Sequence, residues 1–193
     1  MSQAIAWTSR VKVRVHPQKR ILLGLNLVGG VAVLGSYYAG FATHPESAGA
    51  LWGGVPEGLK PFYTASMLLA AAGYFPFTSF LLFRVDADRA RILGRFGFAW
   101  FNLLYGLILV PSALWMPLTF SLLDTWSPGL WVAIRVVLAL VGIGSLGLLA
   151  ALITLTPARP RALHLLAIAG AIAFCVQTAL LDATVWPAYF PVP

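Results

Sequence analysis

Five long apolar segments, separated by short polar ones, constrain this 193-residue chain more than any other feature of its sequence. A helix of about 20 apolar residues crosses the hydrocarbon core of a bilayer. Hydrophobic residues make up 60% of the chain and charged residues 10%, whereas about a quarter of a typical soluble domain is charged. We therefore expect an all-α fold, a polytopic integral membrane bundle of five transmembrane helices. The expected spans are residues 21–41, 62–83, 96–122, 130–155 and 162–183.

Basic residues are concentrated in the polar segments before the first span, between the second and third, and between the fourth and fifth. These segments hold eleven of the 13 Lys and Arg residues. Cytoplasmic loops of membrane proteins carry an excess of such residues, so we expect the amino terminus in the cytoplasm and the carboxyl terminus outside. Residues 1–20 are then a basic cytoplasmic tail, and residues 21–193 form a single transmembrane domain. The expected location is a bacterial inner (cytoplasmic) membrane.

The distribution of positive charge argues against nucleic acid as a partner. The net charge is +7, but the basic residues fall in short segments between spans, where membrane topology explains them. The expected partners are the lipid bilayer and either other membrane subunits or further copies of this chain. Small residues, which let a neighbouring helix approach closely, support such contacts. They include Gly24, Gly29, Gly30 and Gly35 in the first span and Gly142, Gly144, Ser145 and Gly147 in the fourth.

The polar residues do not form a recognisable catalytic or metal-binding set. The single cysteine, Cys175, lies within the fifth span, so neither a disulfide framework nor a thiolate cluster is expected. The histidines lie on three different segments, which argues against a metal site or a pair of axial haem ligands. We expect a protein that is not an enzyme and holds no metal or cofactor; a bound lipid or apolar pigment stays an open alternative. The histidines are His16, His44 and His164.

Arg135 is the charged residue that fits its segment least well. It lies about five residues, or roughly 8 Å, inside the fourth span, and an arginine at a helix centre costs about 2.5 to 3.5 kcal/mol on insertion scales. Asp124, in the turn before this span, and Asp182, in the fifth span, are the nearest acidic residues along the chain. We favour a structural ion pair of Arg135 with one of them, which would join spans three, four and five. The alternative is contact with an anion or a polar headgroup just below the outer surface.

The third span is expected to be bent and to carry most of the candidate ligand-binding residues. Pro111 and Pro117 interrupt it, and each proline removes a helical hydrogen bond. Aromatic and amide side chains on a bent span can line a pocket between helices. The candidate ligand-binding residues are Asn102, Tyr105, Trp115 and Arg135.

A local resemblance to a known family is centred on Trp115. The segment 114–120 has the sequence Leu-Trp-Met-Pro-Leu-Thr-Phe and is similar to the Trp-x-Pro-x-x-Phe part of the third helix of TspO/MBR-type translocator proteins, which are also small five-helix bundles. Ser112 stands where that family often has Asn. The resemblance implies an apolar cavity for a porphyrin-like or sterol-like molecule, with Trp115 and Asn102 near it.

Two kinds of function are compatible with this sequence. The first, which we favour at this point, is an accessory or structural subunit of a larger membrane complex, because catalytic groups are absent and helix faces are rich in small residues. The second is binding or transport of an apolar small molecule within the bundle. Small-molecule binding is favoured if the four candidate residues line one cavity. An accessory subunit is favoured if aromatic residues and glycine rows face outward.

Overall fold

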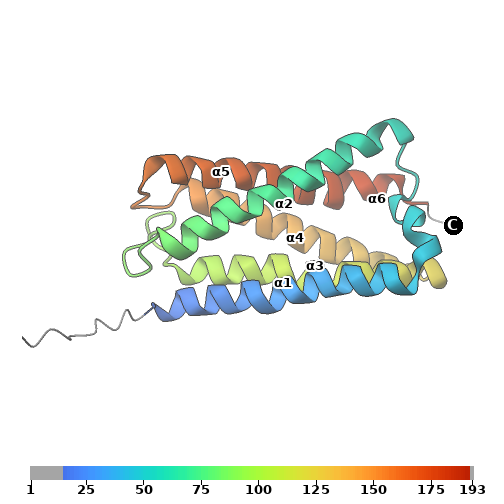
Figure 1. Ribbon diagram of the computed structural model, residues 1–193, viewed down its shortest axis with the longest axis horizontal. Coiled ribbons are helices and arrows are strands. Elements are labelled where there is room, and N and C mark those ends of the chain that lie inside the picture. The colour runs from blue at the N-terminus through green and yellow to red at the C-terminus, as the bar shows by residue number, and fades with distance from the viewer. Residues whose placement is uncertain (1–14, 192–193) are drawn as a thin grey trace, which may run out of the picture.

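Five helical spans lie side by side along the long axis of the computed structural model, which describes residues 15–191 (Figure 1). Each span is long and apolar enough to cross a membrane, which confirms the expected all-α fold with five candidate transmembrane helices. The last span is continuous but consists of three helical pieces. The elements are α1 (Pro17–Thr43), η1 (Pro45–Trp52), η2 (Glu57–Leu59), α2 (Lys60–Phe83), α3 (Ala99–Asp124), α4 (Pro128–Ile153), α5 (Arg161–Cys175), η3 (Val176–Val185) and α6 (Trp186–Tyr189).

Helix boundaries follow proline and capping signals more closely than the apolar runs do. Proline is favoured in the first turn of a helix because it has no N–H to leave unpaired. Helix α1 accordingly begins at Pro17, and the His16 side chain accepts a hydrogen bond from the Gln18 backbone N–H at 3.2 Å. Helix α4 also begins at a proline, Pro128, but without a side-chain capping bond. The end of the expected tail, residues 17–20, is therefore helical, whereas residues 1–14 lie outside the described residues.

The spans form a ring that is almost closed. Helix α3 packs between α1 and α4, the last span packs on α4, and α2 packs on α5. Helices α1 and α2 touch at few positions, and the Tyr74 hydroxyl on α2 donates a 2.7 Å hydrogen bond to the Asn26 side chain on α1. The weakest seam of the bundle therefore lies between α1 and α2.

Helices α2 and α5 approach so closely that their backbones touch. A Cβ atom added to Gly73 would lie 2.6 Å from the carbonyl oxygen of Gly170. Only glycine at both positions permits this contact, which is the small-residue packing that brings helices together in membranes.

The interior contains two apolar clusters, one in each half of the bundle. The first includes Phe77, Phe101, Tyr105 and Leu148 and extends to the loop between α2 and α3. The second lies toward the other end of the bundle. It includes Tyr63, Leu122, Ile134, Leu138, Leu181, Trp186 and Phe190.

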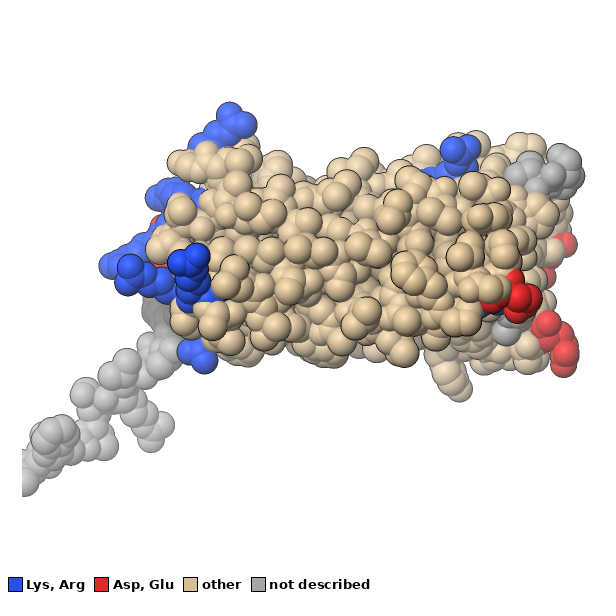
Figure 2. Space-filling model, turned by 90° about the horizontal axis from the view of Figure 1, so that it is seen from above, with Lys and Arg blue, Asp and Glu red and all other residues tan. Residues whose placement is uncertain are grey.

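The two ends of the bundle differ in charge (Figure 2). We call one the basic end, because it carries Lys19, Arg20, Arg84, Arg89, Arg91, Arg95, Arg159 and Arg161, and the other the opposite end. At the basic end the α2–α3 loop is tied to the α4–α5 loop, since Arg91 and Thr156 exchange backbone hydrogen bonds of 2.8 and 2.9 Å. The opposite end carries Glu46, Glu57 and Asp124 together with Lys60.

Candidate functional site

The structure does not bring the four predicted ligand-binding residues to one place. Asn102 and Trp115 are thirteen positions apart on α3, which corresponds to about 20 Å along a helix. The Asn102 amide donates hydrogen bonds to the backbone and side-chain oxygens of Gln18 at 3.2 and 2.6 Å, near the basic end. Tyr105 is fully buried, with its hydroxyl 2.7 Å from the Thr78 hydroxyl. Trp115 lies in the interior of the opposite half of the bundle. Arg135 belongs to the same half but lies on its outer surface.

The predicted ion pair of Arg135 with Asp124 or Asp182 is not formed, which corrects the sequence interpretation. The four ion pairs within residues 15–191 do not include Arg135. Its side chain is exposed on the outer surface of α4, while Ile134 and Leu138 face the interior. Asp124 contacts His44 at 3.2 Å, and Asp182 is held within its own span. The direction in which Arg135 leaves the helix is the physical reason for this difference.

A π-helical segment, η3, positions Asp182 in the last span. The Gln177 side chain donates a 2.7 Å hydrogen bond to Asp182 Oδ1. Residues five apart lie about 140° apart around an α-helix with 3.6 residues per turn, but a π-helix bonds i to i+5 and brings them to the same face. The local helix type therefore aligns this amide and carboxyl group, and π-helical turns are frequent at functional sites.

Trp115 on α3 lies in the same half of the bundle as this pair, packed against the apolar cluster that includes Leu181 and Trp186, and it contacts Tyr37 on α1. The rings of Trp115 and Tyr37 are 5.9 Å apart, and Trp115 is also 6.1 Å from the ring of Trp186. We call Tyr37, Trp115, Gln177 and Asp182 the polar cluster.

Two atoms of the polar cluster are buried without a hydrogen-bond partner among the described residues. They are the indole nitrogen of Trp115, a donor, and the Oε1 atom of Gln177, an acceptor. Gln177 is only 6% exposed. Leaving such an atom unpaired costs about 1 to 3 kcal/mol, so a group that supplied an acceptor to Trp115 or a donor to Gln177 would be stabilised there.

A layer of aromatic side chains packs together near the opposite end of the bundle. The indole N–H of Trp186 donates a 2.9 Å hydrogen bond to the Leu51 carbonyl in η1. Phe190 packs against both Trp186 and Trp131, with ring distances of 4.7 and 5.2 Å. This aromatic layer separates the polar cluster from the opposite end of the bundle.

The sequence showed polar residues in the last span but not how they are arranged relative to one another. Polar and acidic side chains inside a span are expensive and mark functional positions, so Gln177 and Asp182 carried a usable signal. The π-helix that joins them did not. The sequence also left His44 unassigned, whereas its ring contacts Thr43 at 2.8 Å and stacks on Phe120 at 4.5 Å.

Neither a metal-binding group among the described residues nor a match to a known protein indicates what the polar cluster binds. Within residues 15–191, His, Cys, Asp and Glu do not form a group of three or more that could hold a metal ion. No protein-family model, curated protein or solved structure matches this chain.

Proposed function

We propose that this chain is a multi-pass membrane protein that binds a mainly apolar small molecule in the half of the bundle opposite its basic loops. The ligand lies between α1, α3 and η3 and forms hydrogen bonds with Trp115 and Gln177. Porphyrin-like and sterol-like molecules are the candidate classes, because each combines a large apolar surface with few hydrogen-bonding groups. The resemblance of segment 114–120 to TspO-type translocators points to the same classes and to Trp115.

The observation that supports this proposal is the presence of two buried, unpartnered polar atoms, Trp115 Nε1 and Gln177 Oε1, in the same half of the bundle. A span that only packs against lipid and other helices has no need of a buried amide, because an apolar residue of similar size avoids its desolvation. Trp115 Nε1 and Gln177 Oε1 come from different helices. A ligand that pairs with both therefore also bridges α3 and the last span.

The test is ligand titration of the purified full-length chain, with protoporphyrin IX and cholesterol as separate probes. We expect one of them to bind. Trp115→Phe removes the unpartnered donor, and Gln177→Leu removes the unpartnered acceptor together with the amide group that donates to Asp182. Both keep most of the side-chain volume. Since a net hydrogen bond contributes about 1 kcal/mol and 1.4 kcal/mol corresponds to tenfold, each variant should weaken binding about fivefold.

Trp100→Phe is the matched control. Trp100 lies at the start of α3, toward the basic end, and stacks on Phe96 with a ring distance of 4.6 Å, so this variant should bind with the affinity of the original chain. Trp115→Phe should stay folded, because it removes an atom that has no partner. Gln177→Leu also removes the donor to Asp182 and should lower the free energy of unfolding by about 1 to 3 kcal/mol, so its fold is checked by far-UV circular dichroism before binding is compared. The proposal is wrong if neither probe binds, or if Trp115→Phe and Trp100→Phe bind equally well.

A second candidate function is an accessory subunit of a larger membrane complex. By the criterion set from the sequence, the separation of the four predicted ligand-binding residues and one face of α1 favour it, whereas the unpartnered atoms of Trp115 and Gln177 favour a ligand. Val28 is 74% exposed and Tyr38 79% exposed. Gly24 and Gly35 lie eleven positions apart, just over three full turns, and a Cβ atom at either would meet open space. Lipid covers exposed apolar side chains equally well, so the glycines, which allow close approach of another helix, are the distinguishing observation.

Gly24→Ile and Gly35→Ile test the accessory-subunit function. Each adds a β-branched side chain where the single chain has room, so the chain itself should stay folded. If another subunit packs on this face, gentle extraction at native expression level should recover a complex from the original chain and the isolated chain from the variants. Recovery of the isolated chain in every case removes this candidate.

Insertion and orientation in the membrane follow from the charge at the two ends. The basic end belongs in the cytoplasm by the positive-inside rule, and an inner (cytoplasmic) membrane of a bacterium is the proposed location. Single cysteines placed at Arg159 and Glu57 in a Cys175→Ala background report the orientation. A membrane-impermeant thiol reagent added to intact cells should label position 57 only; labelling of position 159 only would reverse the topology.

A further inference from the structure

Arg135 is exposed on α4 without an acidic partner among residues 15–191. It is the eighth residue of the helix, which begins at Pro128, and so lies about 10 Å along the helix axis from the opposite end. An arginine at this depth can extend its guanidinium toward the membrane surface while its methylene groups stay in contact with apolar surface. An unpaired positive charge is thus available close to the level of the lipid headgroups.

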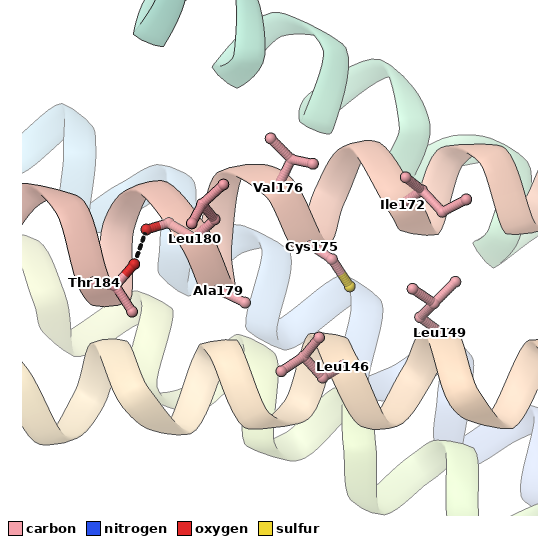
Figure 3. A pocket seen from close by; sticks show the side chains of 8 residues that line it. All are labelled: Leu146, Leu149, Ile172, Cys175, Val176, Ala179, Leu180 and Thr184. Atoms are coloured by element: carbon pink, nitrogen blue, oxygen red, sulfur yellow. Dashed lines mark hydrogen bonds between the residues drawn. The ribbon is translucent and has the colours of Figure 1, made fainter.

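A shallow apolar groove runs between α4 and the last span (Figure 3). Its α4 wall is formed by Leu146 and Leu149, and Cys175 lies between the two helices. The other wall includes Ile172, Val176, Ala179, Leu180 and Thr184, and the Thr184 hydroxyl donates a hydrogen bond to the Leu180 carbonyl. The groove has a volume of about 350 Å³ and an almost entirely apolar lining.

Arg135 and the groove lie on the same side of α4. Residues 135 and 146 are eleven positions apart, which returns to within about 20° of the same direction around an α-helix and spans about 16 Å. One leaflet contributes about half of the 30 Å hydrocarbon core. The positive charge and the apolar groove are therefore separated by the distance between a lipid phosphate and the end of its acyl chain.

We propose that an anionic bilayer phospholipid occupies this surface, with its phosphate at Arg135 and one acyl chain in the groove between α4 and the last span. Guanidinium and phosphate form paired, charge-assisted hydrogen bonds. A zwitterionic lipid brings its own cation close to Arg135, so a lipid with net negative charge is preferred. This surface is distinct from the polar cluster, since Gln177 and Leu181 face the interior while Leu180 and Thr184 face outward.

Photo-cross-linking in nanodiscs locates the lipid directly. The full-length chain is reconstituted with phosphatidylglycerol or phosphatidylcholine that carries a diazirine near the end of one acyl chain, and labelled peptides are mapped by mass spectrometry. Peptides that contain Leu146 and Val176 should be labelled about fivefold more by phosphatidylglycerol than by phosphatidylcholine. This factor corresponds to the contribution of about 1 kcal/mol that one Lys or Arg makes near an anionic membrane surface. In Arg135→Gln the two lipids should label the groove equally.

Further variants separate the contribution of the headgroup from that of the acyl chain. Leu146→Trp places a larger side chain in the groove and should reduce groove labelling by both lipids. Ile143→Trp, at an exposed α4 residue that does not line the groove, should not. Arg161→Gln, at the basic end, should leave groove labelling unchanged. Equal labelling by both lipids in the original chain, or a preference that persists in Arg135→Gln, overturns the proposal.

Discussion

Substitution of Gly73 by alanine tests the closest helix contact in the bundle. The added Cβ would lie 2.6 Å from the Gly170 carbonyl oxygen, whereas ordinary van der Waals contact begins at 3.4 Å. Helices α2 and α5 must therefore move apart by about 0.8 Å, the difference between these two distances. A gap of that size removes roughly a quarter to a half of the dispersion attraction between facing atoms.

The net effect of Gly73→Ala combines two opposing contributions. Overpacking costs about 1 to 3 kcal/mol, and replacement of glycine by alanine within a helix returns about 0.5 to 1 kcal/mol. We expect the free energy of unfolding to fall by about 1 kcal/mol, the difference between the midpoints of these ranges. The measurement is reversible unfolding by sodium dodecyl sulfate in mixed micelles, followed by far-UV circular dichroism.

Gly106→Ala is the control, because a Cβ atom at Gly106 meets open space. It lies within α3 and should leave stability unchanged or slightly raised. The double variant of Gly73 and Gly170 should lose less than the sum of the two single losses, since one separation of the helices accommodates both methyl groups. Equal stability of Gly73→Ala and Gly106→Ala would refute the packing described here.

Four other substitutions test the remaining contacts by the same unfolding measurement. Thr78→Val leaves the buried Tyr105 hydroxyl unpaired and should lower the free energy of unfolding by about 1 to 3 kcal/mol; adding Tyr105→Phe should recover most of this loss. Tyr74→Phe removes the hydrogen bond to Asn26. It should lower the free energy of unfolding by about 1 kcal/mol and speed hydrogen exchange in α1. Arg135→Leu should not destabilise the chain, whereas a loss of about 3 to 5 kcal/mol would indicate an ion pair. His44→Gln disrupts the exposed contact with Asp124 and should change stability by less than about 1 kcal/mol.

The number and type of helices could be predicted because the membrane signal depends on length and composition alone. A run of about 20 apolar residues has few other stable structures. The direction in which Arg135 leaves α4 could not be predicted. A helix that is apolar on every side carries no periodic signal for its buried face, so the sequence did not show that Leu138 faces the interior and Arg135 the outside.

The polar cluster was hidden for a related reason. Gln177 and Asp182 are five positions apart, a spacing that separates two residues around an α-helix and joins them only around a π-helix. No local sequence signal announced that change of helix type. The contact between Trp115 and Tyr37 depends in turn on how α1 packs against α3, which glycine content alone does not specify.

Native mass spectrometry of the gently extracted chain tests the proposed function most directly, with the Trp115→Phe/Gln177→Leu double variant measured in parallel. The account predicts that the original chain carries a bound small molecule other than phospholipid. It also predicts that the folded double variant has lost that molecule. Retention of the same molecule by the double variant, or absence of any such molecule from the original chain, would contradict a ligand site at the polar cluster.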